Sequence, residues 1–241
     1  MTVFRALAEG FDELSGALSA TIGIAIAATD RAEVSAVGQW STGVAWSTIK
    51  VPLAIAALRN ARPTTSEMVT KTITESDNPA AESLWSQLGG PADAARQVQA
   101  VIKETGDDCT LVESRRLRPG FTPFGQTLWS LDRQAHFAAY LPGLRQAATV
   151  IDFMRHLSDG QRWGLAAKGI AAKGGWGPGS SGGYLVRQFG VVPTKSGHVG
   201  VALAAEASDF ETGVHGLNQM TEWLVSQLPH LSQHGGHDGV G

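Results

Sequence analysis

Strand-like sequence occurs only near the two ends of this chain, and this distribution limits the possible folds more than any other feature. Two β-branched runs, at 21–29 and 32–40, lie near the N-terminus and flank a predicted turn at Asp30 and Arg31. Three short strand candidates follow residue 165: 168–174, 183–192 and 197–205. The chain can pair these two groups in one sheet only by bringing its ends together.

Helical segments surround the strand candidates. Residues 4–18 repeat apolar side chains at alternating spacings of three and four residues, and Phe210 to Leu228 do the same. Residues 46–60 are rich in alanine and leucine, and 64–158 contain several helical pieces separated by turns. We therefore predict an α+β fold: one mixed antiparallel sheet of five strands, flanked by the terminal helices, with a helical lobe inserted.

The length of the chain fits one domain with an internal division. Its 241 residues, 43% of them apolar, can bury a sizeable core. We predict a single domain over residues 1–230, with an α/β part at about 1–45 and 160–230 and a helical lobe at about 46–159. Residues 231–241 are predicted to form a flexible tail. A small-molecule or peptide substrate would bind in a cleft between the two parts.

Composition excludes several classes of partner and cofactor. The 19 lysine and arginine residues nearly balance 22 aspartate and glutamate residues, so no strong positive field favours nucleic acid. Cys109 is the single cysteine, which excludes an internal disulfide and a cysteine-rich metal site. We predict no metal and no cofactor. No apolar run reaches the roughly 18 residues that a membrane helix needs.

The N-terminal residues give no secretory signal, because charged side chains interrupt the stretch from Met1 to Ala20. We expect a cytoplasmic location if the chain is full length and an extracytoplasmic one if a leader was removed. A cytoplasmic location would make cell-wall peptide a poor candidate for the substrate.

Ser47 and Lys50 are the first candidate catalytic pair. Residues three apart share one face of a helix, so the amine of Lys50 can reach the hydroxyl of Ser47. A serine needs a base to take its proton, and a partly buried lysine with a lowered pKa can act as one. A Ser-x-x-Lys pattern also arises by chance about once in a chain of this length. Taken alone, the pattern favours an N-cap serine beside a solvated lysine.

Ser76, Asp77 and Asn78 lie on a short connection between two helical stretches. A second hydroxyl can relay a proton to a leaving group, and an asparagine amide can bind both the lysine and a substrate carbonyl. These residue types also favour ordinary turns. The triplet occurs by chance in only about a few per cent of chains of this size, so a catalytic role is favoured.

Lys173 ends a strand candidate and is followed by two glycines and Trp176. A lysine beside an accessible backbone edge suits an anionic substrate, and the N–H of Trp176 is a candidate oxyanion donor. A lysine before a glycine-rich loop is also common without any function. The candidate substrate-binding residues are Gly174, Gly175, Trp176 and Arg187, the last of which we expect on the neighbouring strand.

In combination the three patterns resemble the S-x-x-K, S-D-N and K-T-G series of penicillin-binding proteins and serine β-lactamases. The flanking stretches WSTIKVPLAIAAL and TESDNPAAESLWSQLGGP resemble the matching regions of class A β-lactamases, and the likeness extends over about residues 4 to 228. The resemblance implies a serine hydrolase or acyltransferase with Ser47 as nucleophile. The remaining catalytic residues that it implies are Lys50, Ser76, Asn78 and Lys173.

Three features depart from the class A pattern. Class A enzymes hydrolyse the acyl-enzyme with a loop glutamate, and alignment on Pro119 places Arg118 there, where an arginine cannot accept a proton. Glu113 lies five residues earlier and could serve only if the loop were rebuilt. Gly174 replaces a threonine or serine whose hydroxyl helps to hold a penicillin carboxylate. The interval between the first two patterns is also shorter than in class A enzymes.

We therefore predict an acylating serine hydrolase that acts on amide or ester bonds, with weak β-lactamase activity at best. The alternative is a catalytically degenerate ligand-binding or scaffolding protein on the same fold. The five catalytic candidates favour the enzyme, whereas Gly174 and the missing glutamate favour the binding protein. A glutaminase-like amidase also uses Ser-x-x-Lys chemistry, but the Ser-Asp-Asn triplet argues against it.

Overall fold

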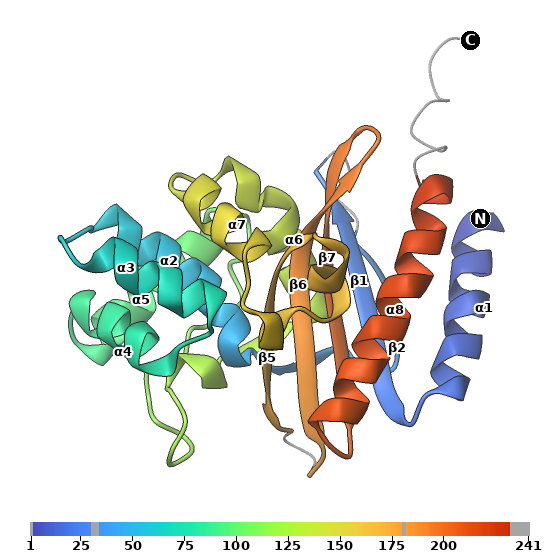
Figure 1. The fold of residues 1–241 in the computed structure, drawn as a ribbon, viewed down its shortest axis with the longest axis horizontal. Helices are drawn as coiled ribbons and strands as arrows, with labels where there is room; N and C mark the ends of the chain where they lie inside the picture. The colour runs from blue at the N-terminus through green and yellow to red at the C-terminus, as the bar shows by residue number, and fades with distance from the viewer. Residues whose placement is uncertain (1, 30–33, 180–181, 232–241) are drawn as a thin grey trace.

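The main sheet joins the two ends of the chain (Figure 1). In the computed structural model, which describes residues 2–29, 34–179 and 182–231, five strands pair antiparallel in the order β2-β1-β7-β6-β5. Their bounds are β1 Ala20–Ala28, β2 Ser35–Gly38, β5 Ala171–Pro178, β6 Tyr184–Thr194 and β7 Gly197–Ala207. Because β1 pairs with β7, the predicted α+β fold with a five-stranded sheet is confirmed.

The terminal helices cover one face of the sheet (Figure 1). They are α1, Thr2–Ala17, and α8, Phe210–Leu231. Phe11 of α1 is fully buried and meets the ring of Trp223 edge-on, with 5.0 Å between ring centroids. Leu217 and Leu224 of α8 are also fully buried in this outer core. The apolar residues whose spacing predicted both helices therefore pack on this face of the sheet.

Helix α6, Leu131–Tyr140, packs on the opposite face of the sheet. Its backbone crosses β7 so closely that a β-carbon on Gly200 would stand 2.1 Å from the carbonyl oxygen of Ala135. Only glycine permits this approach. Helix α6 follows directly from β4, Leu128–Ser130, which pairs with β3, Thr42–Val44, just before the predicted nucleophile. The close packing thereby anchors the candidate site to the sheet.

The remaining helices form a group beside the sheet, opposite α1 and α8 (Figure 1). They are α2 Lys50–Arg59, α3 Thr65–Thr74, α4 Asn78–Gln87, α5 Pro91–Lys103 and α7 Ala147–Arg155. Prolines stand in the first turns of α4 and α5, where a missing N–H costs nothing. Asp77 caps α4 by accepting a hydrogen bond from the N–H of Ala80 at 2.6 Å. The short 3-10 helices are η1 Trp46–Ile49, η2 Phe124–Gln126, η3 Leu141–Gly143, η4 Asp159–Gln161 and η5 Gly164–Lys168.

The structure differs from the sequence-based expectation in two places. The pair β3 and β4 was not predicted, since neither strand exceeds three residues. Strand β5 continues to Pro178, although the glycines from 174 onward predicted a loop. The predicted turn at Asp30 and Arg31 and the predicted tail beyond Leu231 lie outside the described residues.

Helix α6 belongs to the range predicted for the helical lobe but packs on β1 and β7. No described helix has the length and apolar character needed to cross a membrane.

Candidate active site

Ser47 lies in the first turn of η1, which continues directly into α2. The N–H of Ala45 donates to the carbonyl of Thr127 at 2.7 Å, and the hydroxyl of Thr48 donates to the carbonyl of Ala45 at 2.6 Å. Trp46 adopts a φ of 49°, a conformation that costs energy for a bulky residue and that clusters at functional sites. The turn leaves Ser47 half-buried between the buried Trp46 and Thr48, with an N–H that has no acceptor within its helix.

Lys50 directs its amine toward the start of α4. Its Nζ lies 2.6 Å from the carbonyl oxygen of Ser76 and 2.7 Å from Oδ1 of Asn78, with the Ser76 hydroxyl at 3.4 Å. No hydrogen bond joins this amine to Ser47 among the described residues, although the two residues share one face of the helix. Burial lowers the pKa of Lys50 to about 7, and the charge of Asp77 opposes part of that shift. Neutral and charged forms of Lys50 therefore coexist near neutral pH.

Ser76 connects the two lysines. It adopts a φ of 56°, which turns the chain sharply between α3 and α4. Its hydroxyl accepts a hydrogen bond from Nζ of Lys173 at 2.9 Å, and Lys173 also donates to the carbonyl of Gly174 at 3.0 Å. Burial lowers the pKa of Lys173 well below its usual value, and the nearby charge of Lys50 lowers it further. We therefore expect that the two amines do not both stay protonated near neutral pH.

Strand β5 is an edge strand of the main sheet, and it lies beside Ser47. A β-carbon on Gly175 would lie 2.7 Å from the backbone nitrogen of Ser47, so only glycine allows this approach. The carbonyl of Gly174 points to the free edge, where it meets the amine of Lys173. Backbone groups alternate along a strand, so we expect the N–H of Trp176 at the same edge. The N–H groups of Ser47 and Trp176 are thus the candidate oxyanion donors.

The side chain of Trp176 faces the α8 side of the sheet, and so would a side chain at position 174. The Trp176 indole lies 6.1 Å from the ring of Trp163 and 5.5 Å from that of Phe210, between ring centroids. A β-carbon on Gly174 would stand 2.4 Å from the Trp163 ring. Trp163 therefore occupies the space that a threonine or serine at 174 would need. Nothing local in the sequence indicated this role for Trp163.

Arg187 lies on β6 opposite Gly175, as expected for the neighbouring strand, but it does not face the cleft. The side chain has no exposed surface, and its guanidinium stacks over the Trp40 ring at 5.2 Å. The guanidinium donates to four oxygens, which are the carbonyls of Gly43, Val44 and Trp129 and the amide of Gln134. The structure therefore places Arg187 outside the cluster around Ser47, with both terminal nitrogens of its guanidinium bound to the protein.

The loop from α5 to η2 carries the two residues considered for deacylation. Both carboxylate oxygens of Glu113 accept hydrogen bonds from Arg115 at 2.9 Å, and this pairing lowers the pKa of Glu113 to about 2. Glu113 is thus an ion-paired carboxylate and a weak base. Arg118 donates to the carbonyl of Pro178 at 3.0 Å, and its guanidinium lies 5.3 Å from the centroid of the Trp46 ring.

No described group of three or more histidine, cysteine, aspartate or glutamate side chains is placed to hold a metal ion. The described helices and strands contain single histidines at His136, His198, His215 and His230, and His156 follows the end of α7.

No protein-family model matches the sequence, and no curated protein matches it. Several solved structures, however, are similar to this chain. One is a variant of the last common ancestor of Gram-negative class A β-lactamases, with a TM-score of 0.71 and 21% identity, covering 94% of this chain and 99% of that one. The chain has the fold of the class A β-lactamases. A β-lactamase from Streptosporangium roseum gives a TM-score of 0.71 at 16% identity, covering 93% of this chain and 99% of that one.

A third example is the TLA-3 extended-spectrum β-lactamase, with a TM-score of 0.70 at 15% identity over 92% of this chain and 99% of that one. The β-lactamase fold thus accounts for nearly the whole chain. At these identities the likeness establishes the fold, and the activity has to be argued from the site itself.

Replacement of Arg187 by methionine is expected to lower the free energy of unfolding by about 3–5 kcal/mol, because four buried oxygens lose their donor. Denaturant unfolding followed by circular dichroism measures the change. The matched control is Arg96→Met, since Arg96 is exposed and contacts only Asp93 one turn away. That control should stay within about 0.5 kcal/mol of wild type. Equal stabilities for the two variants would contradict the structural role of Arg187.

Proposed function

We propose that this protein is a serine hydrolase or acyltransferase of the penicillin-recognising type. It forms an acyl-enzyme on Ser47 from amide or ester substrates and has weak β-lactamase activity at best. The observation that carries the proposal is the hydrogen-bonded cluster beside Ser47. Three separate segments of the chain bring together its members, which are Lys50, Ser76, Asn78 and Lys173.

Acylation begins when the hydroxyl oxygen of Ser47 attacks the substrate carbonyl carbon. The Ser47 proton passes to neutral Lys50, which follows one helical turn later and whose lowered pKa suits a general base. The new oxyanion accepts hydrogen bonds from the N–H groups of Ser47 and Trp176. Asn78 presents its Oδ1 to Lys50, which leaves its amide N–H groups for a substrate carbonyl.

The leaving group departs when it receives a proton. The hydroxyl of Ser76 is placed for this transfer, since it lies within hydrogen-bonding range of both lysine amines. Ser76 gives its proton to the leaving nitrogen or oxygen and recovers one from the adjacent amines. The carbon–leaving group bond breaks, and the acyl group stays on Ser47.

Hydrolysis of the acyl-enzyme needs a base that activates water. Glu113 is held by Arg115 with a pKa of about 2, so its carboxylate is a poor proton acceptor. Arg118 stands at the sequence position of the class A glutamate and carries a permanent positive charge. Slow release of the acyl group follows from both features.

The alternative is a degenerate ligand-binding or scaffolding protein on this fold. The ion-paired Glu113 and the filled space at Gly174 favour it. The buried amines of Lys50 and Lys173 favour the enzyme instead. A lysine with a pKa near 7 destabilises the folded state and gives a binding protein no advantage.

Wild-type protein incubated with a fluorescent penicillin is expected to gain one covalent adduct. Intact-mass spectrometry and in-gel fluorescence measure the adduct, and Ser47→Ala should lack it. Ser130→Ala is the matched control, because Ser130 lies on β4 outside the cluster and should label as wild type does. If penicillins, esters and activity-based serine probes all give no adduct, the binding protein is the correct alternative.

The adduct is expected to persist for many minutes, because Arg115 holds the Glu113 carboxylate and Arg118 stands at the position of the class A glutamate. Loss of the mass shift is followed after unbound penicillin is removed. Glu113→Gln should release the acyl group at the wild-type rate. Turnover within seconds, abolished by Glu113→Gln, would show that Glu113 acts as the deacylating base.

The acylation rate constant is expected to rise with pH and to reach half of its plateau near pH 7. Only neutral Lys50 accepts the Ser47 proton, and the pKa of Lys50 is about 7. The rate should therefore be about tenfold lower at pH 6 than on the plateau. Stopped-flow measurement with an activated ester between pH 5.5 and 8.5, corrected for spontaneous hydrolysis, gives the profile. A flat profile would exclude Lys50 as the base.

A further inference from the structure

Arg118 bridges two sides of the candidate cleft. It belongs to the loop between α5 and η2, and it donates to the carbonyl of Pro178 at the end of β5, 3.0 Å away. Its guanidinium lies over two aromatic rings, 5.3 Å from the centroid of Trp46 and 5.9 Å from that of Phe121. Trp46 and Phe121 themselves pack edge-on at 5.0 Å. The guanidinium is therefore held in one place beside the residue that precedes the nucleophile.

The charge of Arg118 has no carboxylate partner among the described residues, unlike the charges of the two other arginines on the same loop. Arg115 is paired with Glu113 at 2.9 Å, and Arg116 with Glu82 at 3.0 Å. Arg118 is only half-buried, and its one hydrogen bond uses one of the five guanidinium donors. The remaining donors can bind a planar anion such as a carboxylate in a bidentate manner.

The other cations near Ser47 are already bound to the protein. The amine of Lys173 donates to Ser76 and to the carbonyl of Gly174. Arg187 is enclosed and bonded to four oxygens. Gly174 offers no hydroxyl, and Trp163 occupies the space where one would stand. A substrate carboxylate therefore finds its free donors at Arg118.

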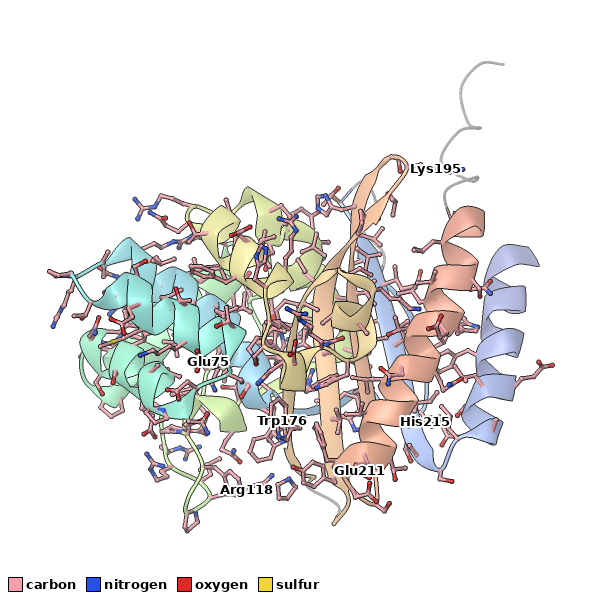
Figure 2. All side chains as sticks on the ribbon, viewed as in Figure 1. Glu75, Arg118, Trp176, Lys195, Glu211 and His215 are labelled. Carbon is pink, nitrogen blue, oxygen red and sulfur yellow. The ribbon has the colours of Figure 1, made fainter. Side chains whose placement is uncertain are left out.

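We propose that Arg118 is a specificity-determining residue that binds a carboxylate of the substrate on the Trp46 side of Ser47. This inference rests on the proposed acyl-transfer function and names the class of substrate: an ester or amide with a free carboxylate. Figure 2 shows Arg118 near the same end of β5 as Trp176, the candidate oxyanion residue. The carboxylate would lie against the guanidinium of Arg118, while the scissile carbonyl reaches the edge of β5.

Two esters test the proposal: the 4-nitrophenyl monoester of glutaric acid and 4-nitrophenyl valerate, which differ in a terminal carboxylate against a methyl group. The measured quantity is the ratio of their acylation rate constants, followed by nitrophenol release. Arg118→Gln should lower the ratio of carboxylate ester to neutral ester at least tenfold, since a hydrogen bond to a charged group is lost. Arg118→Lys should keep part of the preference. Arg116→Gln is the matched control and should leave the ratio unchanged.

A binding measurement separates failure of this proposal from failure of the proposed function. Glutaryl-4-nitroanilide is titrated into Ser47→Ala, and quenching of tryptophan fluorescence reports binding beside Trp46. Binding that weakens at least tenfold with Arg118→Gln supports the anion site, even if neither ester acylates the wild type. An unchanged rate ratio and unchanged nitroanilide binding in Arg118→Gln would overturn the proposal. An equal decrease in the acylation rate constants of both esters would overturn it too, because Arg118 would then only hold the loop in position.

Discussion

The buried guanidinium of Arg187 joins the segment that precedes Ser47 to the main sheet. Arg187 stands on β6, in the middle of the sheet, and binds carbonyls of β3 and β4 together with a side chain of α6. These three elements surround the start of η1, so the position of Ser47 depends on a charge that never reaches solvent. Burial lowers the pKa of Arg187 to about 9, which records the cost of desolvation. Four hydrogen bonds offset that cost, because each satisfies an oxygen that would otherwise be buried without a donor.

Desolvation also acts on the two lysines of the cluster beside Ser47. Lys50 and Lys173 are both buried, and the described residues around them offer hydroxyl, carbonyl and amide oxygens in place of a carboxylate. Desolvation therefore dominates, and the pKa of each amine falls. A fold that stabilised these charges fully would leave no base for the serine. In the proposed mechanism the cluster loses stability and gains a proton acceptor, whereas the terminal nitrogens of Arg187 bind buried oxygens of the protein.

Much of the fold could be predicted from the sequence, because the apolar repeats of α1 and α8 and the strand runs at both ends are local patterns. The residues around Ser47 are also close in sequence or belong to short motifs, and the structure places Lys50, Ser76, Asn78 and Lys173 in one cluster. The enclosed position of Arg187 could not be predicted, because strand alternation does not tell which cation is enclosed and which faces a cleft. The continuation of β5 through its glycines was missed for a related reason. Those glycines are required by Trp163, η1 and Trp46, which all lie far away in the sequence.

The contact between Gly174 and Trp163 also constrains how this site can change over generations. A hydroxyl-bearing residue at 174 cannot enter while Trp163 keeps its ring 2.4 Å from the new β-carbon. A smaller residue at 163 would make room but would open a cavity beside Trp176 and Phe210. A substitution at 163 or at 174 alone is disfavoured. Only a combined change at both positions restores the packing and also introduces a hydroxyl. The effects of substitutions at 163 and 174 therefore depend on each other. Gly174 is constrained by its packing against Trp163, independently of any contact with a substrate.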